Sequence, residues 1–131
     1  MVLLDTCAII WDALEPSKLS KKAKTAIEKA DENKELIISD ISIWEISMLI
    51  KKNRIQVEAT ATQLIKLYLQ MRNILVQPIT PEIAELSVNF DSKMNKDPAD
   101  RIISATSIIY NAKLVTSDKN LIENELIDTV W

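Results

Sequence analysis

The sequence contains no glycine and no histidine, and its 131 residues include a single cysteine, Cys7. The absence of glycine excludes glycine-rich phosphate loops, dinucleotide-binding fingerprints and the nucleophile elbow of hydrolases. Without histidine, the protein has no imidazole general base and no histidine-ligated zinc or iron. One cysteine forms no internal disulfide and fits a reducing compartment. Any catalysis must therefore rely on carboxylates, hydroxyl groups, lysines and arginines.

Charge and hydropathy restrict the class of protein further. The 16 basic and 19 acidic side chains give a net charge of −3, which argues against a general nucleic-acid coat protein but allows a local basic patch. No apolar run approaches the length of a membrane span, and the first residues do not resemble a signal peptide. We expect a cytoplasmic protein that folds as one domain over residues 1–131.

Short apolar runs alternate with segments of helical length. The runs are typical of strands buried on both faces and lie at residues 2–4, 36–38, 74–76 and 114–115, with a further strand expected within 127–131. Helices are predicted over about residues 20–32, 41–52, 59–72, 81–94 and 98–110. The alternation predicts an α/β fold with a mostly parallel central sheet.

The ends of the predicted helices carry recognisable signals. In the absence of glycine, a left-handed residue that closes a helix is usually asparagine. The candidates for this role are Asn33, Asn53, Asn73 and Asn111. Thr80-Pro81 and Asp97-Pro98 each place a capping residue before a proline at the first helical position.

Two or three acidic residues follow predicted strands, and one of them is Asp40, which comes after residues 36–38 and Ser39. Asp5 comes directly after residues 2–4, and Asp118 follows residues 114–115 after the hydroxyl residues Thr116 and Ser117. Each aspartate taken alone is explained as a turn or helix-cap residue. However, the carboxyl ends of parallel strands gather at one edge of a sheet, where functional groups collect. We therefore expect a site at this edge.

Two further carboxylates lie on predicted helices. Glu45 is in an apolar segment, so it is either a solvated residue on a narrow polar stripe or a carboxylate directed into a cleft. Asp100 is the third residue of the helix that begins at Pro98, and the structural interpretation is a capping box with Asp97. A helix N-terminus also suits a functional carboxylate, so the two interpretations are compatible.

Carboxylates brought together in this way repel one another, and no basic residue adjoins Asp5 or Glu45. A hard divalent cation, Mg²⁺ or Mn²⁺, relieves the repulsion. Such a cluster supports metal-assisted phosphodiester hydrolysis, because the metal lowers the pKa of a bound water and neutralises charge on the phosphate. The hydroxyl groups of Thr116 and Ser117 are placed to position that water.

Six segments spread over essentially the whole chain carry a family resemblance. They are Leu3-Leu4-Asp5-Thr6, Ser42-Ile43-Trp44-Glu45-Ile46, Asp97-Pro98-Ala99-Asp100-Arg101-Ile102-Ile103, Ala105-Thr106, Leu114-Val115-Thr116-Ser117-Asp118 and Val130-Trp131. Together they resemble PIN-domain nucleases, and most of all the VapC toxins of bacterial toxin–antitoxin pairs. One departure from the family pattern is Asn95-Lys96, which replaces a pair that often contains histidine or glycine.

The resemblance implies a three-layer α/β/α sandwich around a mostly parallel sheet of about five strands. It implies a site made of Asp5, Glu45, Asp100 and Asp118, with Thr6 and Thr116 as supporting hydroxyls. Within that site, Asp5 and Asp100 would bind Mg²⁺ directly, with Mn²⁺ as a possible substitute, and Glu45 and Asp118 would bind it directly or through water. The implied protein is a homodimeric endoribonuclease that cleaves tRNA or rRNA and is inhibited by a VapB-like antitoxin.

Two other functions are compatible with parts of this pattern. A catalytically silent PIN module that only binds a partner would have the same fold, although the intact carboxylates argue against it. A signalling receiver domain also has a Mg²⁺-binding acidic pocket, but it usually needs two adjacent acidic residues after the first strand. Here Thr6 follows Asp5, and no aspartate directly follows residues 74–76.

Overall fold

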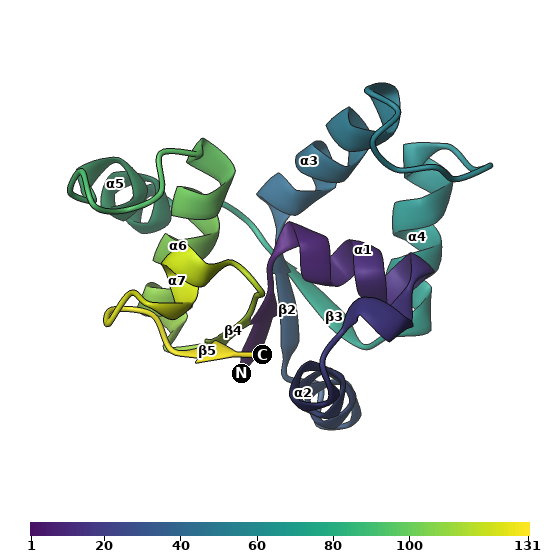
Figure 1. The fold of residues 1–131 in the computed structure, drawn as a ribbon, viewed down its shortest axis with the longest axis horizontal. Coiled ribbons are helices and arrows are strands. Elements are labelled where there is room, and N and C mark those ends of the chain that lie inside the picture. The colour runs from purple at the N-terminus through teal and green to yellow at the C-terminus, as the bar shows by residue number, and fades with distance from the viewer.

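The computed structural model describes all 131 residues and is built on one five-stranded sheet (Figure 1). The strands are β1 (Val2–Leu4), β2 (Leu36–Ser39), β3 (Ile74–Gln77), β4 (Lys113–Val115) and β5 (Thr129–Val130). All pairings are parallel, in the order β3-β2-β1-β4-β5. The parallel sheet is therefore confirmed. Its order excludes a receiver-type domain, in which the first strand lies between the second and third strands.

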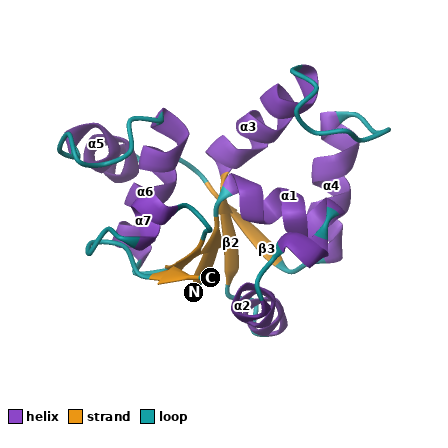
Figure 2. Cartoon of the chain, in the orientation of Figure 1, coloured by secondary structure: helices purple, strands orange, loops and turns teal.

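Helices cover both faces of the sheet and form the three layers expected (Figure 2). In Figure 1, α5, α6 and α7 lie on one side of the strands, α1, α2 and α4 lie on the other, and α3 lies beyond the carboxyl end of β2. The helices are α1 (Thr6–Leu14), α2 (Lys21–Glu32), α3 (Asp40–Lys51), α4 (Ala61–Met71), α5 (Pro81–Asn89), α6 (Pro98–Tyr110) and α7 (Lys119–Ile122), with a 3₁₀ turn at Pro16–Lys18. None of them is long and apolar enough to cross a membrane.

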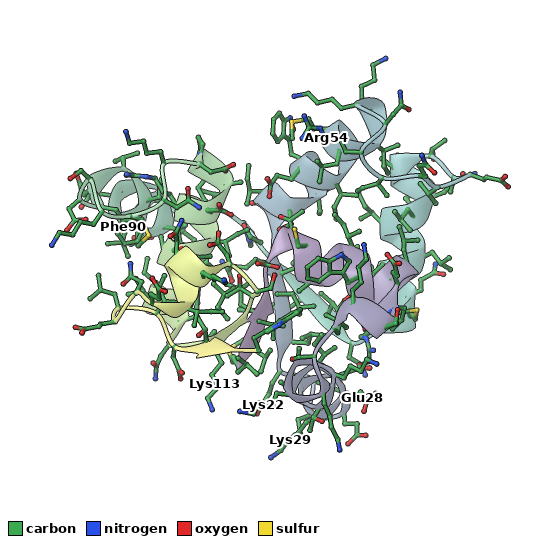
Figure 3. All side chains as sticks on the ribbon, viewed as in Figure 1. Lys22, Glu28, Lys29, Arg54, Phe90 and Lys113 are labelled. Atoms are coloured by element: carbon green, nitrogen blue, oxygen red, sulfur yellow. The ribbon has the colours of Figure 1, made fainter.

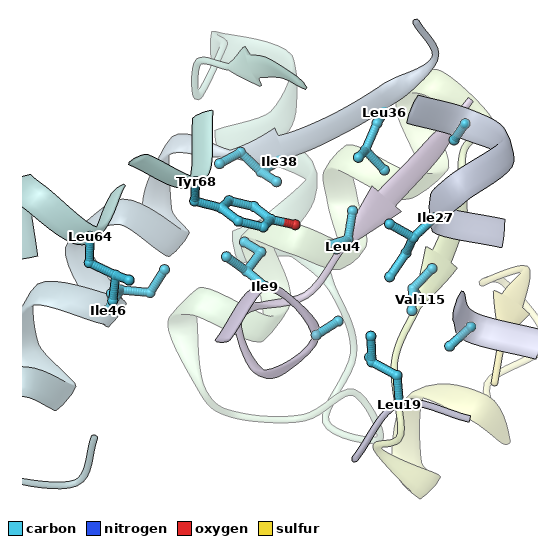
Figure 4. Packing of buried hydrophobic residues seen from close by; sticks show 13 residues of the cluster. Leu4, Ile9, Leu19, Ile27, Leu36, Ile38, Ile46, Leu64, Tyr68 and Val115 are labelled. Atoms are coloured by element: carbon cyan, nitrogen blue, oxygen red, sulfur yellow. The ribbon is translucent and has the colours of Figure 1, made fainter. Parts of the chain in front are cut away.

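The central strand, β1, contributes residues to both hydrophobic cores. Leu4 packs in a larger cluster with side chains from α1, α2, α3 and α4, among them Ile9, Ile27 and Tyr68 (Figure 4). Leu3 is directed to the opposite face, in a cluster with Ile103 and other residues of the α6 and α7 side. Successive residues of a strand face opposite sides, so burying both sides requires the continuous apolar runs seen in the sequence.

Two helix predictions need correction. The helix α1 was not predicted, because its start, Thr6 and Cys7, and the β-branched residues Ile9 and Ile10 have weak helix propensity. Asp5 caps this helix, and burial of its apolar face stabilises it. The predicted helix over 81–94 is too long: α5 ends at Asn89, because Phe90 is extended at φ −60° and ψ 144°.

The prediction for helix ends is confirmed at two of four asparagines. Asn53 and Asn111 are left-handed, at φ 57° and 50°. After α2 the left-handed residue is Lys34, at φ 57°, and not Asn33. Asn73 has no positive φ. Its backbone N–H and its side-chain amide each donate a hydrogen bond to the Asp31 carboxylate, at 2.7 and 3.1 Å respectively.

A partly buried ionic network joins α1, α2 and the end of α4. Arg72 donates two hydrogen bonds to the Asp12 carboxylate, at 2.7 and 2.8 Å, and a third to Asp31 at 3.0 Å. The Tyr68 hydroxyl donates to the same Asp12 carboxylate at 2.7 Å. Hydrogen bonds from the Asn73 backbone and from Arg72 lower the pKa of Asp31. This network holds the helices that cover the larger core.

Candidate active site

Four elements bring the predicted acidic residues to the carboxyl edge of the sheet. Asp5 follows β1 and caps α1, while Asp118 follows β4 and caps α7. Glu45 lies on α3, and Asp100 lies in the first turn of α6. In Figure 1, α1, α3 and α6 each begin near this end of the strands. The sheet order explains the gathering, since β1 and β4 are neighbours and α3 directly follows β2.

Asp5 is the most buried of the four carboxylates, with 8% of its surface exposed. Its side chain accepts a hydrogen bond from the Ala8 backbone N–H at 2.8 Å, which caps α1. Burial raises the pKa of Asp5 to about 6, and the negative charges of Asp118 and Glu45 add to this. A hydrogen bond from Thr116 acts in the opposite direction. The prediction of a helix cap and that of a desolvated carboxylate therefore both apply to this residue.

Glu45 is held by a hydroxyl pair. Thr6 donates a hydrogen bond to the Glu45 carboxylate and also shares one with the Ser42 hydroxyl at 3.0 Å. Burial raises the pKa of Glu45, the hydrogen bond from Thr6 lowers it, and the charge of Asp97 raises it. Glu45 is thus not a freely solvated residue on a polar stripe. The contact from Thr6 fixes the position of Glu45 relative to Asp5, which directly precedes Thr6 in the chain.

Asn95 connects the other two carboxylates. Its side-chain amide donates to Asp100 at 2.7 Å and, more weakly, to Asp118 at 3.4 Å. The backbone N–H of Asp118 in turn donates to the Thr116 hydroxyl at 3.1 Å. The pKa of Asp100 is raised to about 7, chiefly by burial. The negative charges of four other carboxylates raise it further, in decreasing order Asp97, Glu45, Asp118 and Asp5.

The predicted capping box at the start of α6 is only half formed. The Asp97 side chain caps the helix by accepting from the backbone N–H groups of Ala99 and Asp100, at 2.9 and 3.3 Å. The Asp97 N–H donates to the Asn95 side-chain oxygen at 3.3 Å and not to Asp100. The Asn95 side chain thus accepts the hydrogen bond from the Asp97 N–H that a capping box would assign to Asp100. The Asp100 carboxylate instead accepts from the Asn95 amide, at the acidic site.

Sequence reasoning missed the contacts made by Asn95 and Ser42. Asn95 drew notice only as a departure from the family pattern, and nothing local predicts that its amide reaches two aspartates. The three-residue spacing places Ser42 on the helix face of Glu45, but it does not predict the hydrogen bond to Thr6, which lies 36 positions away.

No cationic side chain compensates the acidic residues. The three salt bridges of the protein pair Lys18 and Arg72 with other acidic residues, and none involves the four carboxylates of this site. Cys7 adds no negative charge, because burial and the nearby carboxylates raise the pKa of its thiol to about 11. The remaining contacts to the four carboxylates come from neutral donors.

This donor set fits a hard divalent cation. Carboxylate and hydroxyl oxygens are the ligands that Mg²⁺ and Mn²⁺ prefer, and no nitrogen of histidine or thiolate competes. No three acidic or cysteine side chains lie close enough to enclose a metal ion by themselves. That arrangement suits Mg²⁺, which retains several waters and is commonly bound through one or two carboxylates.

Comparisons with known proteins agree with this fold. The family model "PIN domain" matches residues 2–125. Ribonuclease VapC22 of Mycobacterium tuberculosis (strain ATCC 25618 / H37Rv) is 37% identical over 120 residues, covering 92% of this chain and 88% of that protein.

Two solved structures share the fold. The VapBC2 structure from Rickettsia felis, bound to a promoter DNA fragment, has a TM-score of 0.75 at 14% identity and covers 98% of this chain and 97% of that one. A toxin–antitoxin complex from Klebsiella pneumoniae has a TM-score of 0.66 at 23% identity, covering 97% and 95%.

Proposed function

The chain belongs to the PIN-domain family, and from this premise we propose that it is a Mg²⁺-dependent endoribonuclease toxin of the VapC type. Its substrate would be tRNA or rRNA, whose cleavage inhibits translation, and residues 1–131 would act as one domain. A single observation carries the proposal: four carboxylates from four elements gather at one sheet edge without a cationic partner.

Each site residue has a role in this proposal. Asp5 and Asp100 would bind Mg²⁺, or Mn²⁺ in its place, directly, and Glu45 and Asp118 would bind it directly or through water. The cation supplies water activation and charge neutralisation at the phosphodiester. The supporting hydroxyls are those of Thr6 and Thr116, whose hydrogen bonds fix the orientation of the acidic side chains.

The protonation of the carboxylates also determines at which pH the site can bind a cation. Asp5 and Asp100, with pKa values raised to about 6 and about 7, must lose their protons before they bind a cation. An unneutralised acidic edge repels the phosphates of RNA. Cation binding and RNA binding at this edge are therefore expected to reinforce each other.

Cleavage of total RNA tests the proposed activity. The purified protein is incubated with RNA in Mg²⁺ or Mn²⁺, in EDTA, and as the variants Asp100→Asn and Glu58→Gln. Glu58 is an exposed carboxylate outside the site and serves as the matched control. We expect discrete fragments from the wild type and Glu58→Gln, and none in EDTA or from Asp100→Asn. Intact RNA from a folded, metal-bound sample would instead support the silent partner-binding module.

The proposal includes two protein partners and a compartment. The structural neighbours from R. felis and K. pneumoniae are toxin–antitoxin complexes, which supports a VapB-like antitoxin for this chain. An RNA substrate and one free cysteine both fit the cytoplasm. A homodimer is proposed because the family resemblance implies one. Light scattering should give twice 14.9 kDa, and a monomer mass would contradict the dimer.

A further inference from the structure

A basic hollow of about 900 Å³ lies at the opposite edge of the sheet from the acidic site. Its walls come from one face of α2, from the first residues of β1 and from the segments that lead into β2, β4 and β5. Four lysines line it: Lys21, Lys22, Lys29 and Lys113. Figure 3 shows Lys22, Lys29 and Lys113 along the lower edge of the molecule, around α2 and below the strands.

The positive charge of the basic hollow is not neutralised within the chain. None of its four lysines forms a salt bridge, although Glu35 and Asp128 also line the hollow. The excess is two positive charges in a protein whose net charge is −3. Basic residues are thus concentrated here against the overall charge of the chain.

The position of two of these lysines does not serve helix stability. Lys21 and Lys22 occupy the first turn of α2, which contains no acidic residue. The helix dipole is positive at this end and disfavours cations. An anionic ligand in the hollow would turn this unfavourable placement into a favourable one.

We propose that the basic hollow binds phosphodiester groups of the RNA substrate, at a point remote from the bond that is cut. This inference rests on the proposed function. Lysine ammonium groups are the usual sequence-independent contacts to nucleic-acid phosphates. The exposed lysines and a hollow of this size suit a section of RNA backbone.

The geometry allows one RNA molecule to reach both edges. The strand β1 has three residues, so at about 3.3 Å per residue the two edges of the sheet are about 10 Å apart along it. The acidic edge repels RNA until a cation binds, so the initial attraction must come from elsewhere on the surface. The basic hollow supplies this attraction and holds the RNA while the cleavage site is loaded.

Binding of labelled bulk tRNA, measured in EDTA so that no cleavage occurs, tests this inference. The variant Lys22→Gln/Lys29→Gln/Lys113→Gln removes three charges from the hollow. The control Lys24→Gln/Lys66→Gln/Lys93→Gln removes three exposed lysines that do not line it. Because both variants change the net charge equally, they separate local contacts from long-range attraction.

We expect the hollow variant to bind tRNA on the order of tenfold more weakly than the control variant, with a salt-dependence slope smaller by about 2 to 3. Equal affinities of the two triple variants would overturn the inference. Displacement of tRNA by ATP at matched phosphate concentration would also overturn it, by assigning the hollow to a mononucleotide. Failure of the proposed function would appear separately: RNA would not be cleaved in Mg²⁺, while the binding of tRNA measured in EDTA would be unchanged.

Discussion

At the scale of single residues, protonation and neutral hydrogen bonds determine the state of the acidic site. The pKa values of Asp5 and Asp100 are raised to about 6 and about 7 from 3.8, chiefly by burial. Without a cation, ionising these groups therefore costs folding stability. The residues themselves predict Asp5 and Asp118 at this edge, and the family resemblance implies Glu45 and Asp100. The contacts of Asn95 could not be predicted, because they depend on where the loop before α6 lies in three dimensions.

The stability of the metal-free protein is expected to reflect the Asp100 carboxylate. Its folded pKa exceeds the unfolded value, so destabilisation begins above about pH 4 and is complete above about pH 7. Asp100→Asn should therefore gain stability over the wild type as pH rises from 5 to 8. Since Asp100 is partly exposed, we expect a gain on the order of 1 to 2 kcal/mol.

Denaturant unfolding in EDTA at both pH values measures this difference. Added Mg²⁺ should reverse it at pH 8, by stabilising the wild type and leaving Asp100→Asn unchanged. If Asp100→Asn exceeds the wild type in free energy of unfolding by the same amount at pH 5 and pH 8, ionisation of the Asp100 carboxylate does not destabilise the fold.

The Thr6 hydroxyl is expected to act through Glu45. Thr6→Val removes the hydrogen bonds to Glu45 and Ser42, so RNA cleavage should slow by about tenfold or more, as for other residues that orient metal ligands. Thr6→Ser retains the hydroxyl and should restore most of the rate. Cleavage rates at saturating Mg²⁺ and matched folded fractions provide the measurement. Equal loss in both variants would point to packing of the threonine methyl group instead.

At the scale of elements, the sheet was predictable and some helices were not. Four continuous apolar runs identified four strands, because a strand buried on both faces must be apolar throughout. The helix α1 escaped prediction because tertiary packing of Ala8 and Ile9 outweighs weak local propensity. The network of Arg72 with Asp12 and Asp31 also escaped it, since these residues lie 60 and 41 positions apart.

Removing Arg72 tests how far this network stabilises the helices around the larger core. Arg72→Ala leaves the Asp12 carboxylate, 5% exposed, without its cationic partner. We expect a loss of about 3 kcal/mol in the free energy of unfolding, because an unpaired buried charge is costly. Lys66→Ala, at an exposed position of α4, should change it by less than about 0.5 kcal/mol. Comparable effects of the two substitutions would mean that the Arg72 network contributes little.

At the scale of the whole molecule, the two edges of one short sheet carry opposite charge. The carboxyl edge gathers four carboxylates, and the amino edge holds the basic hollow. The sequence predicted part of the acidic edge, because Asp5 and Asp118 follow parallel strands, and the family resemblance added Glu45 and Asp100, which lie on helices. It did not predict the hollow, because its lysines come from α2 and from the start of β4, which approach each other only in the folded chain.

The central claim is that the acidic edge binds a divalent cation that RNA cleavage requires. The most direct test titrates the wild type with Mn²⁺, follows occupancy by electron paramagnetic resonance, and measures RNA cleavage at the same Mn²⁺ concentrations. The account predicts that occupancy and cleavage rise together, and that Asp100→Asn loses both while Glu58→Gln keeps both. Cleavage that persists in EDTA, or Mn²⁺ binding that Asp100→Asn leaves unchanged, would contradict it.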